Sequence, residues 1–133
     1  INNEIECFEA LREFHRMGNL ISLPIIRERN QMDFFPWSFS EPLSVNKIGV
    51  PEPNKSRKIE PDILLVPLVG FDKYKYRIGY GGGYYDRYIE KLSKIKKILT
   101  IGLAFSFQKV NKISVNKYDK KLDYILTEKY FIE

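Results

Sequence analysis

The stretch RIGYGGGYYDRY, residues 77–88, gathers residue types that could bind phosphate. It contains four glycines, begins with Arg77 and carries Asp86 near its end. Glycines let a phosphate oxygen approach backbone N–H groups without meeting a Cβ, and they permit the positive φ at which successive amides converge. Arg77 can donate two charge-assisted hydrogen bonds to phosphate oxygens. A carboxylate beside a phosphate is usually tolerated because a divalent cation lies between them, so Asp86 is a candidate metal ligand.

This loop matches neither of two widespread phosphate-binding motifs. The P-loop ends in Gly-Lys-Ser/Thr, whereas Gly83 is followed by Tyr84 and Tyr85. The dinucleotide motif GxGxxG fits Gly79 and Gly81 but requires a third glycine at position 84. A tight turn, in which the glycines only reverse the chain and the tyrosines pack, is the alternative interpretation. The combination of arginine, glycines, an aromatic pair and Asp-Arg favours the phosphate site.

The elements around the loop determine where it would lie. An apolar run at 62–71, DILLVPLVGF, predicts a buried strand, and residues 72–77 predict an extended arm that leads into the loop. Apolar residues at helical spacing in 84–95 predict a helix that begins at the end of the loop. The N terminus of a helix presents unpaired N–H groups and the positive end of the helix dipole. The predicted helix therefore adds to the attraction for an anion.

The rest of the chain predicts an α/β fold. We expect a helix over 2–19 that ends at Gly18-Asn19, and a loop over 40–61, which holds four of the seven prolines. Four other segments predict strands, of which the first would be central and buried on both faces and the second an edge strand interrupted by Pro36: 20–26, 32–39, 98–105 and 123–128. This alternation predicts one α/β domain over residues 1–133, with helices packed on the faces of a sheet.

Composition restricts the classes of function. The net charge of +5 suits anionic ligands, but the lysines are scattered and no nucleic-acid-binding motif occurs, so we expect no nucleic-acid partner. No apolar run is long enough to span a membrane, and we expect no membrane association. The single cysteine, Cys7, fits a reducing compartment, so a cytoplasmic location is expected. His15 is expected to face water, and neither residue has a predicted chemical role.

Residues 61–92, PDILLVPLVGFDKYKYRIGYGGGYYDRYIEKL, closely resemble the signature region of the 5-formyltetrahydrofolate cyclo-ligases, also called methenyltetrahydrofolate synthetases. Other segments resemble that family in the same order, from NNEIECFEAL through IGVPEP and IGLAFSFQ to NKYDKKLDYILTE. The resemblance implies a monomeric enzyme that uses ATP and Mg²⁺ to convert 5-formyltetrahydrofolate to 5,10-methenyltetrahydrofolate through a phosphorylated formyl intermediate. It also implies a three-layer, mostly parallel sheet with helices on both faces, similar to the sugar-phosphate isomerase and CoA-transferase architecture.

The resemblance also implies roles for particular residues. ATP would be bound by Arg77, Ile78, Gly79, Tyr80, Gly81, Gly82, Gly83, Tyr84 and Tyr85. The reduced folate would be bound by Glu4, Tyr80, Gly81, Gly82, Gly83 and Tyr84. Magnesium would be held by Asp86 and Asp119, with Asp123 as the competitor for the second position, and Arg77 would also be catalytic. An ordinary acid in the first turn of a helix is the alternative interpretation of Glu4.

The sequence departs from the family in two ways. Ile48 stands where many relatives have an aromatic residue, which would remove a stacking partner for the pterin; Trp37 and Phe39 could compensate but fit a core better. The basic N-terminal helix and the strand that open the family are not among these 133 residues, so we expect an N-terminally incomplete chain. Two alternatives remain: a non-catalytic folate- or nucleotide-binding remnant, and a relative of the sugar-phosphate isomerases or CoA-transferases.

Overall fold

The computed structural model describes residues 7–79, 81–117 and 119–133. These divide into two compact units, Phe8–Pro61 and Asp62–Glu133, with Cys7 grouped to the second. Each unit has its own sheets, so each is described separately. The prediction of a single domain stays a prediction.

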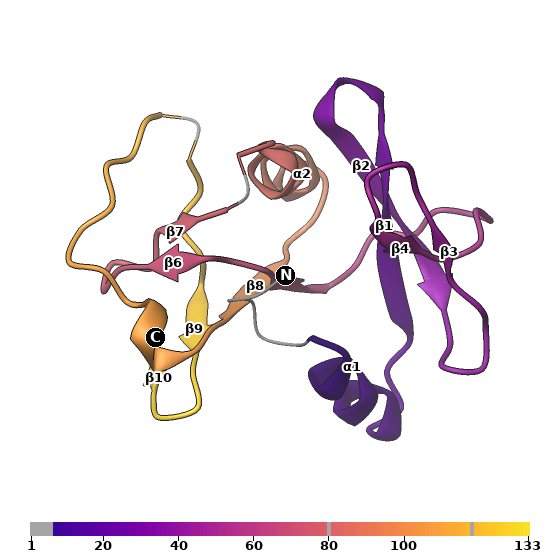
Figure 1. Cartoon of the computed structure of the whole chain (residues 1–133), viewed down its shortest axis with the longest axis horizontal. Helices are drawn as coiled ribbons and strands as arrows, with labels where there is room; N and C mark the ends of the chain where they lie inside the picture. Colours follow the sequence, from indigo (N-terminus) through magenta and orange to yellow (C-terminus); the bar gives the residue numbers. More distant parts are fainter. Residues whose placement is uncertain (1–6, 80, 118) are drawn as a thin grey trace. The chain divides into compact units, whose positions relative to one another are not determined.

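A four-stranded sheet forms the centre of the unit Asp62–Glu133 (Figure 1). Its strands lie in the order β10 (Phe131–Ile132), β9 (Tyr124–Leu126), β8 (Leu99–Leu103) and β5 (Ile63–Val66). β5 pairs with β8 and β8 with β9 in parallel, whereas β10 is antiparallel to β9. The α/β class that the alternating elements predict is confirmed, with mixed parallel and antiparallel pairing in this sheet.

One face of this sheet is buried, and the buried side chains occupy alternate positions along its strands. Leu64, Val66 and Ile125 are each at most 2% exposed, while Leu65 and Leu126 on the opposite face are more accessible. The helix α2 (Tyr84–Ser93) lies in the chain between the parallel strands β5 and β8, which makes a crossover. Its apolar side buries Tyr88, Ile89 and Leu92, as the helical spacing predicts.

The segment 62–77 differs from the predicted strand and arm. β5 ends at Val66, before Pro67, and the chain then forms a hairpin of β6 (Gly70–Phe71) and β7 (Arg77–Ile78). Proline has no N–H for a sheet hydrogen bond, which explains why the strand does not continue. The hairpin turn contains Lys75 at a φ of +73° and is closed by a hydrogen bond from the Asp72 N–H to the Tyr76 carbonyl. This hairpin carries Arg77 to the glycine loop.

The unit Phe8–Pro61 contains most of α1 (Cys7–Arg16) and the hairpin of β1 (Ile21–Arg27) and β2 (Gln31–Trp37). The helix ends at Gly18, whose φ is +93°, with the Gly18 N–H donating to the His15 carbonyl and the Asn19 N–H to the Phe14 carbonyl. These two bonds define a Schellman motif, so the predicted helix stop is confirmed. His15 is exposed, as predicted.

The prediction of a central strand over 20–26 is wrong for the described residues. β1 pairs with β2 alone, in antiparallel register from Ile21 opposite Trp37 to Arg27 opposite Gln31. The connection is the short 3-10 turn η1 (Glu28–Asn30), in which Arg29 and Asn30 both have positive φ. A tight turn joins the strands directly, so an apolar run that suggested a buried central strand forms one arm of a hairpin. A strand is confirmed at this position, but the predicted interruption at Pro36 is wrong, because β2 continues through Pro36 to Trp37.

Residues 40–61 form an ordered loop with one small hairpin, β3 (Ser44–Val45) and β4 (Pro51–Glu52). The Asn46 side-chain carbonyl closes its turn by accepting hydrogen bonds from the N–H groups of Ile48 and Val50. Ile48 is 68% exposed. Trp37 is buried and contacts Phe8 and Phe39 edge-on, so the expectation that this aromatic pair fits a core is confirmed.

The expected three-layer arrangement, with helices on both faces of the sheet, stays a prediction. In the part of the chain that the structure describes, none of the helices is long and apolar enough to cross a membrane.

Candidate phosphate and metal site

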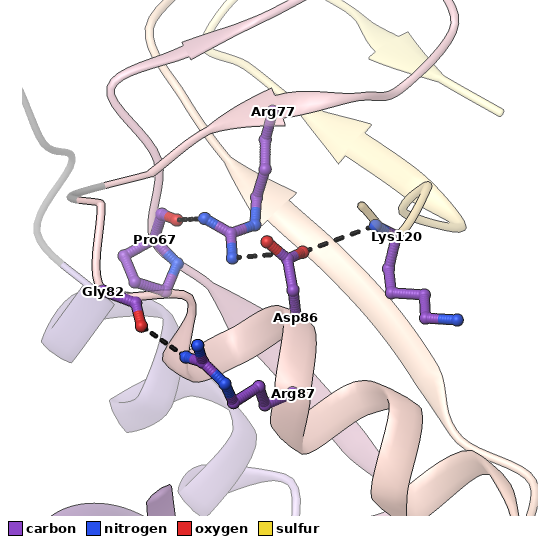
Figure 2. A network of polar contacts seen from close by, with 6 residues as sticks. All are labelled: Pro67, Arg77, Gly82, Asp86, Arg87 and Lys120. Atoms are coloured by element: carbon purple, nitrogen blue, oxygen red, sulfur yellow. Dashed lines mark hydrogen bonds and ion pairs between the residues drawn. The ribbon is translucent and has the colours of Figure 1, made fainter. Parts of the chain in front are cut away.

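Arg77, the last residue of the predicted arm, is the buried cation of the site. Its side chain is 7% exposed, on β7. Nη2 lies 3.6 Å from Oδ1 of Asp86, and Nη1 donates a long hydrogen bond of 3.5 Å to the Pro67 carbonyl (Figure 2). Nε is buried and finds no hydrogen-bond acceptor among the described residues. A buried donor without a partner is costly. Because its other two contacts are long, the guanidinium could bind an anion that comes closer.

The charges around Arg77 oppose the effect of its burial. Burial lowers the pKa of Arg77 because the charged form loses hydration. The neighbouring Asp86, Tyr85 and Asp119 raise the same pKa by favouring the cation, in that order of size. The guanidinium carbon also lies 5.7 Å from the centre of the Tyr85 ring. Both predicted metal ligands are therefore close enough to Arg77 to influence its charge.

Asp86 lies in the first turn of α2, where a carboxylate interacts favourably with the helix dipole. Its side chain is 27% exposed and points toward Arg77 in Figure 2. Its Oδ1 accepts a long hydrogen bond, 3.4 Å, from the backbone N–H of Lys120. The Lys120 ammonium points away from Asp86 in the same view and pairs with Glu90. Asp86 is thus accessible and only loosely held, as a metal ligand has to be.

Asp119 and Asp123 have different surroundings. Asp119 Oδ2 accepts one hydrogen bond, 3.0 Å, from the Asn116 N–H, and Lys120, the next residue, contacts Asp86. Asp123 Oδ2 instead accepts bonds of 2.8 and 3.0 Å from the backbone N–H and hydroxyl of Thr100, beside the sheet. The Asp123 carboxylate is therefore engaged by Thr100 of β8, and Asp119 is the better candidate for the second metal position.

The glycines have different surroundings in the loop. A Cβ at Gly79 would lie 2.4 Å from the guanidinium of Arg77, and a Cβ at Gly82 would lie 2.5 Å from the Tyr84 ring. Gly81 has a φ of +94° with open space around its Cβ position, and Gly83 has a φ of +69°. Side chains of the protein itself thus account for the absence of a Cβ at positions 79 and 82. At Gly81 the positive φ favours glycine, and a Cβ there would meet no described atom within 4 Å apart from its chain neighbours.

The loop ends in a helix N terminus without a side-chain cap, because the N-cap residue is Gly83. Arg87 folds back and donates a hydrogen bond of 2.6 Å from Nη1 to the Gly82 carbonyl (Figure 2). With that carbonyl turned toward a guanidinium, the amides of the loop and of the first helical turn are the groups left for an anion. The sequence analysis did not predict this contact of Arg87.

Some predicted residues cannot be placed. Glu4, predicted for the folate, and Tyr80, predicted for ATP and the folate, lie outside the described residues. Ile78 is on β7 and 42% exposed, and Tyr84 and Tyr85 begin α2. Within the described ranges, no three His, Cys, Asp or Glu residues gather to hold a metal. Magnesium, however, is commonly bound by one or two carboxylates together with water and phosphate, so the pair Asp86 and Asp119 fits that ion.

Sequence analysis missed Asp72, which is fully buried beside the site. Its Oδ1 accepts hydrogen bonds from the N–H groups of Tyr74 and Tyr76, at 2.9 and 3.1 Å, and its Oδ2 from the Ile113 N–H, at 3.0 Å. One signal could have identified it: an acid directly after a buried apolar run, followed by a charged turn, is typical of a carboxylate that organises a turn.

The fold and the site define a class: an α/β protein with a parallel sheet, a glycine loop that leads into a helix, a buried arginine and two nearby carboxylates. A profile of the 5-formyltetrahydrofolate cyclo-ligase family matches residues 1–128. The chain belongs to that family. The predicted family and its enzyme class, a ligase of folate metabolism, are confirmed, and the alternative of an isomerase or CoA-transferase relative is not supported.

Two relatives and two solved structures show how far the similarity extends. The chain is 36% identical to a 5-formyltetrahydrofolate cyclo-ligase of Mycoplasma pneumoniae over 79% of this chain and 69% of the relative. It is 29% identical to that of Escherichia coli (strain K12) over 95% and 72%. The solved 5,10-methenyltetrahydrofolate synthetases of Mycoplasma pneumoniae and Aquifex aeolicus align with TM-scores of 0.66 and 0.74, at 30% and 29% identity. These two alignments include 94% and 98% of this chain, but only 66% of each solved chain.

Proposed function

We propose that this chain converts 5-formyltetrahydrofolate to 5,10-methenyltetrahydrofolate with consumption of ATP. The observation that carries the proposal is the buried guanidinium of Arg77, which has an unpartnered Nε among the described residues and lies beside a glycine loop and Asp86. The names of the relatives supply the reaction, and the site supplies groups suited to a triphosphate and a cation. The chain spans 66% of each solved chain, so the activity of the whole protein is part of this proposal.

The reaction requires ATP because a formyl oxygen is a poor leaving group. In the proposed sequence the formyl oxygen attacks the γ-phosphorus, and the bond from that phosphorus to the bridging oxygen breaks and releases ADP. The neighbouring folate nitrogen then attacks the activated carbon and gives up its N–H proton to solvent. The carbon–oxygen bond breaks, and phosphate leaves with the former formyl oxygen. The enzyme contributes mainly positioning and stabilisation of charge, as in other phosphoryl transfers.

The residues have distinct roles in this proposal. Arg77 binds and stabilises the transferred phosphoryl group, and the backbone amides from Ile78 through Tyr85 bind the phosphates. Asp86 and Asp119 hold Mg²⁺, which neutralises phosphate charge when bound. Gly81, Gly82, Gly83 and Tyr84 border the folate next to the loop, together with Tyr80, and Glu4 accepts a hydrogen bond from the pterin. The protein acts as a monomer in the cytoplasm.

The test is the MgATP-dependent appearance of the methenyl chromophore from 5-formyltetrahydrofolate. We expect a rate well above the control without ATP, and a matched loss of ATP. Binding of MgATP without any product would favour the non-catalytic remnant. Absence of both binding and product would contradict the assignment of residues 77–88 as a phosphate site.

A further inference from the structure

Asp72 contacts both chain segments that carry the proposed site residues. Its carboxylate is 0% exposed. Oδ1 accepts from the N–H groups of Tyr74 and Tyr76, within the hairpin turn that ends at Arg77. Oδ2 accepts from the N–H of Ile113, at a sequence separation of 41 residues, in the segment that leads to Asp119. One buried side chain therefore joins the two segments.

The hydrogen bonds of Asp72 satisfy a charge that would otherwise be costly to bury. A carboxylate that accepts bonds from three backbone N–H groups holds those groups in fixed positions. Replacement by an amide would turn one acceptor into a donor that faces an N–H group. An amide of the same size therefore cannot reproduce all three hydrogen bonds.

Neighbouring backbone contacts extend the connection. The Val110 N–H donates to the Phe71 carbonyl at 2.7 Å, and the Leu122 N–H donates to the Lys75 carbonyl at 2.9 Å. The segment 110–122 is therefore attached to the β6–β7 hairpin before, at and after the contact of Asp72. Lys120, in the same segment, donates its N–H to Asp86. These hydrogen bonds hold the described residues of the segment next to the hairpin that carries Arg77 and next to Asp86.

We propose that Asp72 is a positioning residue that sets the distance between the phosphate-binding Arg77 and the metal ligand Asp119. This inference rests on the proposed function. Arg77 and Asp119 must act on the same triphosphate and cation, and they come from segments that the chain separates by a helix and a strand. Asp72 touches neither the proposed ligands nor the reacting atoms, and it acts through the two segments that it joins.

The experiment compares two variants on the intact protein. Asp72→Asn changes the carboxylate. Ile113→Pro removes the N–H that joins Asp72 to the second segment and also restricts the backbone there, but it leaves the hairpin bonds of Asp72 in place. Val115→Pro is the control for the effect of proline itself, because the Val115 N–H donates to no described residue. Amide hydrogen exchange should accelerate in 110–122 for both variants and in 73–79 for Asp72→Asn, and it should be unchanged in β5 and α2. Unchanged exchange in 110–122 for both variants would overturn the role of Asp72.

Calorimetric titration with MgATP tests the consequence for the site. We expect both variants to weaken MgATP binding and raise the half-saturating Mg²⁺ concentration, by roughly 10-fold to 100-fold as for other residues that orient metal ligands. Combined with Asp119→Asn, Asp72→Asn should lose less than the product of the two separate losses, because both act on the same metal position. Fully multiplicative losses, or wild-type affinity in Ile113→Pro, would overturn the proposal.

Failure of the proposed function has a different signature. Wild-type protein that binds no MgATP would contradict the phosphate site, while the exchange data would still decide whether Asp72 joins the two segments. Normal MgATP binding by the wild type and by both variants would leave the proposed function in place and overturn the role of Asp72.

Discussion

The guanidinium of Arg77 concentrates positive charge where the glycine loop begins. Its side chain is almost fully buried, while Asp86 and Asp119 lie close enough to raise its pKa against the effect of burial. A buried cation with two carboxylates nearby is suited to exchange its weak contacts for a phosphate once a divalent cation occupies the acids. Predictions about single residues follow from this balance of charge.

Asp86→Asn should reduce kcat/KM for MgATP by about 10- to 100-fold, because an amide is a weaker ligand for Mg²⁺. The amide oxygen can still accept from the Lys120 N–H, so circular dichroism and the thermal midpoint should change little. Glu90→Gln is the matched control one turn along α2, since Glu90 pairs with surface lysines. Equal loss in both variants would show that the helix surface, and not the carboxylate at position 86, determines activity.

Gly82→Val should raise the KM for MgATP about tenfold or more, through a changed loop. The new Cβ would lie within 2.7 Å of two atoms of the Tyr84 ring, so the ring must move into the space beside the loop. Tyr84 is only half-buried, and the unfolding midpoint in urea should therefore stay close to that of the wild type. Steady-state kinetics with varied MgATP provide the measurement, and an unchanged KM would contradict the placement of ATP on this loop.

At the scale of elements, the crossover from β5 through α2 to β8 places the loop. Pro67 ends β5, and its carbonyl accepts from Arg77, so the strand end and the hairpin meet at the guanidinium. Gly102 of β8 lies opposite Ile125 of β9, and its missing side chain leaves room for the side chains packed on this face. A Cβ there would lie 2.8 Å from a Leu122 methyl and 2.9 Å from an Ile125 methyl, both fully buried.

Gly102→Ala should therefore destabilise the unit Asp62–Glu133 by about 1–3 kcal/mol, the usual cost of an extra methyl group in a filled core. Leu122 would be displaced, and with it the segment that carries Asp119, so MgATP affinity should fall as well. Urea unfolding followed by circular dichroism gives the stability. Tryptophan fluorescence is unsuitable because Trp37 lies in the other unit. Wild-type stability would mean that the side chains around Gly102 have more freedom than the structure shows.

At the scale of the whole molecule, two glutamates link stability to pH. The ammonium of Lys120 lowers the pKa of Glu90, and the backbone N–H of Ser106 lowers that of Glu128. A carboxyl group with a lowered pKa in the folded state binds its proton more readily when unfolded. Its contribution to stability is therefore present above the ordinary glutamate pKa and is lost as the pH falls through the lower, folded value.

The thermal midpoint should thus fall in acid, below the ordinary pKa of glutamate, and Glu128→Gln should reduce the slope of that fall. Both carboxylates are on the surface, so the effect should be small and should weaken further in salt for the pair of Glu90 and Lys120. Thermal scans across the acid range at two salt concentrations provide the measurement. A steeper acid loss in Glu128→Gln than in the wild type would contradict the direction assigned to its pKa.

Much of the local structure could be predicted from sequence. Helical spacing of Tyr88, Ile89 and Leu92 gave α2, apolar runs gave β8 and β9, and Gly18 marked the end of α1. These features depend on side-chain periodicity and on backbone conformations that neighbours in the chain decide. The apolar run 20–26 misled because an equally apolar strand can be central or one arm of a hairpin, and only its pairing partner distinguishes the two.

The sequence by itself determined the family, the glycine loop before a helix and the acids Asp86 and Asp119 as candidates, because residue types and short spacings carry that information. Tertiary structure alone decided which acid lies near Arg77, that Asp123 instead binds Thr100, and that Asp72 joins two segments 41 residues apart. The physical reason is range: turns and helices follow from neighbours in the chain, whereas the burial of a charge and its partners depend on segments that meet only when the chain is folded.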